Sequence, residues 1–531
     1  MSLRCHTTCE IVLLLLGLLI PLFTSVETNI FIVDQYVYYR YSVAAGLPYG
    51  QSEVPEACQN VTINRLHDTD KEKRDWVQKN TAYLTSVNNF VITITAAFST
   101  LVMGYVSDRY GRRSVLLWIM LTEALRVSLA AFIVMFNLNQ WTVLVPNIIE
   151  GVLCGGLICA ISQICVCVVD LTEHGDKTKM EAKRLILLTL FDAVACFSLA
   201  AGKAIAGNTI YYHGFAISAM ISLILFVPGV IAVYWLPETR EYLMIWKGEY
   251  KPDELVDPEG DTMNVTNSNK NTTLSSHVCG TFRTSVKELK KLLWTGNSAS
   301  LTVIAILFLF SVAAIVDIQY LFLYLMGRPF CWNSAGVGLY CSLSDAVSAI
   351  FSLLVVLLVT FLGVSLRVRQ PNTEIKNTLS EDSSEEQPCI PANRFSNRQL
   401  TKHQKTLIIF LVSGMVPVML HKITMGVASF FPTPVATQIL YVALALKVTR
   451  SLNIPVMRAL LASGVDSGEQ GRLFSLTALA ERIGILISVS ALPPIYAASV
   501  ASVPATVFFI TAAVLALAIL LIGLLPALYS K

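Results

Sequence analysis

The feature that most constrains this chain is a series of apolar runs, each long enough to cross a lipid bilayer. A transmembrane helix needs about 20 predominantly apolar residues. Twelve such runs can be counted in the 531 residues, six before a hydrophilic segment at 238–297 and six after it. In lipid the backbone must satisfy its own hydrogen bonds, so we expect helices. The sequence predicts an all-α membrane protein with twelve transmembrane helices in two pseudo-symmetric six-helix halves.

The expected helices divide the chain into segments with distinct roles. They cover about 11–33, 84–106, 114–136, 141–170, 185–207, 211–236, 298–325, 337–366, 405–428, 434–457, 472–498 and 503–528. The N-terminal half is 1–237 with an exterior loop at 42–82, and 238–297 is a cytoplasmic central loop. The C-terminal half is 298–531, with a cytoplasmic loop at 367–404 that we expect to be disordered. A signal peptide is the alternative interpretation of the first run, but no small-residue cleavage pattern closes it.

Composition supports a membrane protein and argues against other classes. Charged residues make up 14% of the chain, whereas soluble proteins carry about 25%. The net charge of +3 is too small to favour nucleic-acid binding. The sequence holds no Walker loop and no H-E-x-x-H motif, so neither ATP-driven transport nor an enzyme is expected. We expect no cofactor and no metal.

The distribution of Lys and Arg predicts the orientation. The connections after spans 2, 4, 6, 8 and 10 hold most of these residues, and those after spans 3, 9 and 11 hold none. By the positive-inside rule both termini are cytoplasmic. The first exterior loop contains several cations against the trend, but one loop does not outweigh the others. We favour the plasma membrane over an endosome or lysosome as the location.

A short charged connection joins the second and third spans. It reads Gly104-Tyr-Val-Ser-Asp108-Arg-Tyr-Gly111-Arg112-Arg113. Gly111 can supply the positive φ that reverses the chain. Asp108 lies within a turn of both arginines, and an ion pair there can hold neighbouring helices in one arrangement. This pattern resembles the signature loop of the major facilitator superfamily, and we interpret it as the cytoplasmic latch of an outward-facing state. A plain charged turn is the alternative.

Ionisable residues inside the spans are expected to have a structural or functional role, because a charge at the bilayer centre costs about 2.5–3.5 kcal/mol even on lenient scales. Glu123 and Arg126 lie three residues apart on one helical face and can neutralise each other. Glu150, Asp192 and Asp317 have no cation within one helical turn, so we treat them as unpaired and as candidates for proton coupling. A structural role is the alternative for each. Further ionisable groups in the spans are Asp345, His421, Lys422, Lys447, Arg450, Glu481 and Arg482.

Several stretches together resemble the proton-coupled folate transporter family, which includes the thymic stromal cotransporter-like proteins. They are the signature loop, Pro329-Phe-Cys331-Trp332, and Pro455-Val-Met-Arg458 followed by Gly468–Phe474. The resemblance implies a twelve-helix carrier that uses a proton gradient to import organic anions. It also implies a functional role for Arg458, which keeps its positive charge and could attract an anionic solute.

The chain departs from the family at the proton-coupling positions. The family's glutamate in span 5 falls on Thr189 and its histidine in span 7 falls on Ala314. Asp192 and Asp317 follow these positions by three residues, and Glu150 stands in span 4. The resemblance is therefore compatible with a carboxylate-based proton relay that is displaced by one turn.

The predicted orientation leaves Cys58 and Cys331 as exterior cysteines, one in each half. An oxidising exterior permits a disulfide, and we predict that they pair, as the family resemblance also implies. Two free thiols are the alternative. Asn60 opens the sequon Asn60-Val-Thr62 and is an exterior glycosylation acceptor.

The leading hypothesis is a proton-coupled symporter of a small organic solute, expected to be anionic and folate-like or related. It works by alternating access, in which the two halves rock about a midplane site. Its partners are the solute, protons and the lipid bilayer. The alternative is a receptor or adaptor built on a carrier fold, which binds partners through its long loops and transports nothing.

Overall fold

The structure is a computed structural model that describes residues 8–47, 49, 66–172, 177–239, 298–314, 316–327, 329–368, 402–462 and 470–529. In this part of the chain every regular element is a helix. Cys58, Asn60 and most of the central loop fall outside the described residues, and so does most of the loop at 367–404. The predictions made for them stay predictions.

The N-terminal half provides six crossings. Its elements are α1 (Thr8–Ala44), α3 (Leu66–Tyr110), α4 (Arg112–Met135), η1 (Gln140–Val143), α5 (Leu144–Leu153), α6 (Gly156–Thr172) and α7 (Lys177–Trp235). The segment η1–α5–α6 forms one crossing that is interrupted at Gly155. Helix α7 forms two crossings, because Gly214 has the non-helical φ of 77° and interrupts the helix there. Only glycine adopts such a backbone without strain.

The C-terminal half provides another six crossings. Its elements are α10 (Ser298–Ala314), α11 (Val316–Gln319), α12 (Leu321–Met326), α13 (Ser334–Val368), α14 (Lys402–Ala428), α15 (Thr433–Leu446), η3 (Lys447–Leu452), α16 (Asn453–Ala462), α17 (Gln470–Ser499) and α18 (Thr506–Tyr529). Helices α10, α11 and α12 together form the first of these crossings, and α15, η3 and α16 form the fourth. The twelve predicted spans are all present as helical crossings within the described residues.

Length and apolarity account for these crossings. Ten described segments are long and apolar enough to cross a membrane, and one of them, Ile186–Trp235, contains the reversal at Gly214. The shorter apolar helix Ser298–Ala314 begins the remaining crossing. Several helices extend beyond the predicted bounds, and two of them enter the segment 42–82, where α1 continues to Ala44 and α3 begins at Leu66. Part of the segment 42–82, predicted to be a loop, is therefore helical.

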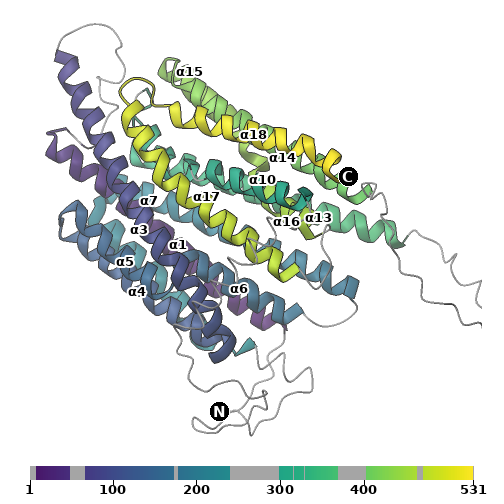
Figure 1. Cartoon of the computed structure of the whole chain (residues 1–531). Helices are drawn as coiled ribbons and strands as arrows, with labels where there is room; N and C mark the ends of the chain where they lie inside the picture. The colour runs from purple at the N-terminus through teal and green to yellow at the C-terminus, as the bar shows by residue number, and fades with distance from the viewer. Residues whose placement is uncertain are drawn as a thin grey trace, which may run out of the picture.

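Among the described residues, the buried hydrophobic core that both halves share lies at one end. Figure 1 shows the early helices, in purple and blue, on one side and the late helices, in green and yellow, on the other. One buried cluster contains residues of both halves, from Phe31 and Tyr41 in α1 to Tyr320 and Phe508. Two other clusters, one in each half, occupy the opposite end near the signature loop. We call the shared end the closed end. The orientation predicted from the Lys and Arg distribution would place the closed end outside, and this stays a prediction.

Close backbone contact holds the closed end together. A Cβ atom at Gly207 of α7 would lie 2.6 Å from the carbonyl oxygen of Ser334 and 2.9 Å from the Cα of Gly338 in α13. Side chains add to this contact, because Ser334 and Tyr49 both donate a hydrogen bond to Oε1 of Gln35. Burial raises the pKa of the Tyr49 hydroxyl, which remains a neutral donor.

Candidate functional site

Three buried charged side chains meet in the N-terminal half. Nε of Arg126 lies 2.9 Å from the carboxylate of Glu123 and 3.2 Å from that of Glu150. The predicted pairing of Glu123 with Arg126 is confirmed. The description of Glu150 as unpaired is wrong, because its cation comes from α4 rather than from its own helix. The triad contains two carboxylates and one guanidinium, and all three side chains are at most 5% exposed.

A break in the fourth crossing positions Glu150. The chain leaves α5 at Leu153 and starts again as α6 at Gly156, and both Gly155 and Gly156 have positive φ. A Cβ atom at Gly156 would lie 2.7 Å from Oε1 of Glu150, so only glycine leaves room for this carboxylate. The main-chain N–H of Leu157, in the first turn of α6, hydrogen-bonds to the same carboxylate. Unpaired N–H groups make a helix N-terminus favourable for an anion.

A cavity of about 210 Å³ lies beside this triad. Helices α1, α3, α4, α5 and α7 surround it, together with Phe322 of α12. Its polar lining consists of Glu27, Asp34, Asn88, Asn89, Arg126, Asn147, Glu150 and Lys203. A pocket with a few convergent polar groups is the default candidate for a solute site. No group of His, Cys, Asp and Glu side chains suited to a metal ion occurs among the described residues.

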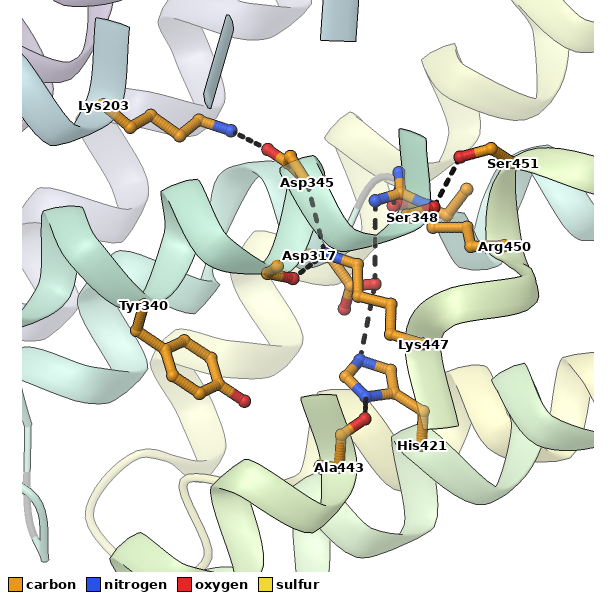
Figure 2. Close-up of polar contacts among 12 residues, drawn as sticks. Lys203, Asp317, Tyr340, Asp345, Ser348, His421, Ala443, Lys447, Arg450 and Ser451 are labelled. Atoms are coloured by element: carbon orange, nitrogen blue, oxygen red, sulfur yellow. Dashed lines mark hydrogen bonds and ion pairs between the residues drawn. The ribbon is translucent and has the colours of Figure 1, made fainter. Parts of the chain in front are cut away.

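Lys203 links the cavity to the C-terminal half. Its Nζ lies 3.3 Å from Glu27 of α1 and 2.6 Å from Asp345 of α13. On the far side of Asp345, Nζ of Lys447 lies 3.4 Å from the other carboxylate oxygen and 2.5 Å from Oγ of Ser344. Figure 2 shows Lys203 and Lys447 reaching Asp345 from opposite sides. In the part of the chain that the structure describes, this is the ion pair that joins the two halves.

A second buried cluster surrounds Asp317 in the C-terminal half. Its carboxylate lies 2.5 Å from Nζ of Lys422, 3.7 Å from Nε2 of His421 and 4.0 Å from Nη1 of Arg450. Asp317 was also predicted to be unpaired, and this is wrong because α14 and η3 supply its cations. Cations outnumber carboxylates here, so the charge of Asp317 is well compensated.

The helix break between α10 and α11 belongs to the same cluster. Nη2 of Arg450 donates a 3.2 Å hydrogen bond to the carbonyl oxygen of Ala314, the last residue of α10. On the other side, Nδ1 of His421 donates a 2.7 Å hydrogen bond to the carbonyl of Ala443 (Figure 2). These bonds hold Arg450 and His421 in place. The contacts therefore favour a structural role for the cluster around Asp317.

Comparison with known proteins identifies the family. The family model of the Major Facilitator Superfamily matches residues 81–373, more than half of the chain. The chain belongs to the major facilitator superfamily. Its members are transporters and not enzymes, so the protein is a secondary transporter. No curated protein sequence matches the chain.

Solved structures share the fold of the transporter at low sequence identity. A bacterial homologue of the iron transporter ferroportin in the inward-facing state is 13% identical, with a TM-score of 0.55, and the match covers 98% of this chain and 100% of that chain. The nucleoside transporter NupG is 10% identical, with a TM-score of 0.55 and coverage of 97% and 99%. A D-xylose–proton symporter is 11% identical, with a TM-score of 0.51 and coverage of 95% and 96%. These similarities concern the fold alone.

The signature loop of the transporter makes its described contacts within the N-terminal half. Gly111 has a φ of 98°, as predicted. Nε of Arg112 lies 3.3 Å from Asp170 at the end of α6. Glu238 accepts hydrogen bonds of 2.7 and 3.0 Å from the main-chain N–H groups of Arg112 and Arg113. The side chain of Asp108 lies outside the described residues, so the latch role of the loop stays a prediction.

Two candidate residues lie away from the cavity lining. Asp192 has an exposed side chain on α7 and interacts electrostatically with Arg458 of the other half. Arg458 on α16 pairs with Glu481 of α17 at 3.0 and 3.1 Å. Its guanidinium is 47% exposed and already has an acidic partner. The described partner of Glu481 is therefore Arg458, on the neighbouring helix α16.

The described cysteines bear on the predicted disulfide. Cys331 is disulfide-bonded, while Cys341 and the other described cysteines are free thiols. Cys58, its predicted partner, lies outside the described residues, so the pairing itself stays a prediction.

Sequence reasoning did not select Lys203, although it joins the two halves. The available signal was a lysine within an apolar run, in a protein whose other spans carry several acids. A buried cation of this kind predicts a carboxylate on a neighbouring helix.

Proposed function

We propose that the protein is a proton-coupled symporter of a small organic solute that carries an anionic group. The observation that supports this most directly is the sharing of Arg126 by two buried carboxylates at the wall of the cavity. The same arrangement offers a place for a proton and a place for an anion. The plasma membrane, folate-like solutes and cytoplasmic termini belong to this proposal as hypotheses to test.

The proton is assigned to Glu150. With both carboxylates ionised, the triad carries one negative charge more than Arg126 can compensate, and a buried uncompensated charge is strongly unfavourable. One proton removes the excess. Asp317 does not offer this, because Lys422 and Arg450 already compensate it. Between Glu150 and Asp317, the charge balance therefore favours Glu150, and Asp192, which does not line this cavity, stays the second candidate.

Protonation of Glu150 also prepares the anion site. A neutral carboxyl group no longer holds Arg126 by an ion pair, and the guanidinium can then form a bidentate contact with a carboxylate of the solute. Proton and anion together add no net charge to the buried site. Binding of either one therefore favours binding of the other.

Alternating access requires that the contact between the halves can break. Lys203 stands between Glu27 in the cavity and Asp345 in the opposite half. A change in charge at the cavity alters how strongly Lys203 is held on the N-terminal side. We assign this pair the role of transmitting solute binding to the closed end.

The test is uptake at about pH 5.5 and about pH 7.5 in cells that express the transporter, with a panel of labelled organic acids that includes folate. The wild type should take up its solute faster at the lower pH. Glu150→Gln mimics the neutral carboxyl, so its uptake should no longer depend on pH. Glu10→Gln, at the exposed start of α1, is the matched control and should keep the pH dependence of the wild type.

Two results would contradict the proposal. A wild-type uptake that is equal at both pH values for every transported solute rules out proton coupling. A Glu150→Gln transporter with the full pH dependence of the wild type assigns the proton to another group.

A further inference from the structure

The cavity contains more negative than positive charge. Three of its lining side chains are carboxylates, Glu27, Asp34 and Glu150, and two are cations, Arg126 and Lys203. Proton uptake by Glu150 reduces this excess, but Arg126 still compensates Glu123, and a monoanionic solute adds a negative charge again. A solute that brings its own positive charge avoids this cost.

Asp34 is the carboxylate that has no direct hydrogen bond or ion pair among the described residues, although Lys203 acts on it at longer range. Glu27 pairs with Lys203 and Glu150 with Arg126. Asp34 lies two helical turns along α1 from Glu27, is partly buried and lines the cavity, yet it forms no hydrogen bond or ion pair among the described residues. Its carboxylate is not fully enclosed by protein, so a group in the cavity can reach it. A positively charged group of the solute is suited to be that partner.

Arg126 has a complementary unused donor. Its Nε is bound by the two carboxylates and its Nη1 donates to Oδ1 of Asn29 at 3.3 Å. Its Nη2 is buried and has no hydrogen-bond partner among the described residues. Arg126 on α4, which lines the cavity, thus keeps one unused donor, and Asp34 on α1 keeps a carboxylate without a hydrogen bond or ion pair.

We propose that the cavity binds a zwitterionic amino acid or a related amino-carboxylate, with the carboxylate on Arg126 and the amine on Asp34. This inference rests on the proposed function and narrows its solute class. Asp34 is a specificity-determining residue in this assignment, since it separates amino-carboxylates from simple organic anions.

The rest of the lining is suited to the body of such a solute. Nδ2 of Asn147 donates a 2.8 Å hydrogen bond to Asn88, which presents an amide pair on one wall. On another wall the rings of Phe31 and Phe322 meet edge to face with centroids 6.5 Å apart. An apolar or aromatic side chain can pack on these rings, because edge and face contacts between aromatic groups are favourable.

The experiment measures binding and needs no gradient. Full-length transporter purified in detergent is titrated at about pH 5.5 with two matched sets of probes, and the shift in its melting temperature is recorded. One set is L-phenylalanine, 3-phenylpropionate and 2-phenylethylamine. The other is 5-aminopentanoate, pentanoate and pentylamine. In at least one set the zwitterion should bind with an apparent Kd about tenfold lower than the acid or amine, which corresponds to one contact of 1.4 kcal/mol.

Variants connect this preference to Asp34. Asp34→Asn keeps the shape but removes the charge, so the zwitterion should lose its advantage while the acid binds as before. Asp34→Glu should keep a preference for the zwitterion and serves as the folded reference if the amide variant is unstable. Glu10→Gln is the control on the same helix. Equal binding of zwitterion and acid in both sets, or no binding of either zwitterion, overturns the proposal.

The outcomes separate this inference from the proposed function. Loss of the zwitterion preference with retained acid-stimulated uptake refutes the solute class alone. A preserved zwitterion preference with pH-independent uptake refutes proton coupling alone.

Discussion

Arg126 is the residue whose surroundings define the candidate site. It is buried between two carboxylates on different helices and contacts the cavity. The positive charge of Arg126 stabilises the two buried carboxylates, and it is also available to bind an anionic solute. Stability and transport can therefore be tested on the same side chain.

Replacing Arg126 by methionine should destabilise the transporter. The substitution leaves Glu123 and Glu150 buried without a cation, and removing one partner of a buried ion pair costs about 3–5 kcal/mol. The melting temperature of the purified protein should fall clearly. The triple variant with Glu123→Gln and Glu150→Gln should recover much of this loss, because it removes both uncompensated charges. Equal stability of the single and triple variants would contradict the electrostatic explanation.

Glu238 should stabilise the start of α4. Its carboxylate accepts hydrogen bonds from the main-chain N–H groups of Arg112 and Arg113. These groups lie in the first turn of α4 and have no partner within the helix. Hydrogen bonds to a charged group contribute about 1.5–3 kcal/mol, so Glu238→Ala should lower the melting temperature. Glu238→Gln keeps an acceptor but no charge and should lie between the alanine variant and the wild type. An unchanged melting temperature for Glu238→Ala would show that water replaces the carboxylate at no cost.

At the level of helices, the close approach of α7 and α13 depends on two glycines. Gly207→Val should separate these helices, because the added atoms would overlap the backbone of Ser334 and Gly338. The closed end should then open. Cys341 on α13 is a buried free thiol and reports this opening. Its labelling by a thiol reagent, followed by peptide mass spectrometry, should be faster in the variant than in the wild type.

Gly523→Ala is the matched control for this experiment. A Cβ atom at Gly523 would meet no atom within 4 Å, so this variant should label like the wild type. Equal labelling of Cys341 in Gly207→Val and in the control would show that the closed end tolerates the larger side chain without separating.

The helical elements could be predicted from the sequence, whereas most side-chain pairs could not. Each crossing is set by a local property, a run of about 20 apolar residues. The i,i+3 pair of Glu123 with Arg126 is local too and was predicted correctly. Lys203 and Asp345 are 142 positions apart, and their contact depends on how two helices pack. Nothing in the local sequence contains that information.

The breaks within helices show a similar limit. The positive φ of Gly111 follows from a short charged turn and was predicted. The break at Gly155 and Gly156 lies inside an apolar run, where glycine is also common in unbroken membrane helices. Only the structure shows that the Glu150 carboxylate lies against Gly156, where a Cβ atom would overlap it. For this reason the sequence could name Glu150 but not its partners.

For the whole molecule, the pair Lys203–Asp345 should couple the two halves energetically. Lys203→Gln and Asp345→Asn should each lower the melting temperature, because each leaves a buried charge without its main partner at a cost of about 3 kcal/mol. The double variant should lose less than the sum of the two, and contacting residues typically show such an interaction energy of about 0.5–3 kcal/mol. Strict additivity would show that the two side chains do not stabilise each other.

The core shared by both halves also has a consequence for biosynthesis. Residues of α1, α3 and α7 complete their apolar packing at the closed end against residues of the C-terminal half, among them residues of α12, α13 and α17. The ribosome makes the N-terminal half first, and chains fold largely in the order of synthesis. That half can finish its own cluster near the signature loop, but its closed end must wait in the membrane with incomplete packing until the last helix is inserted.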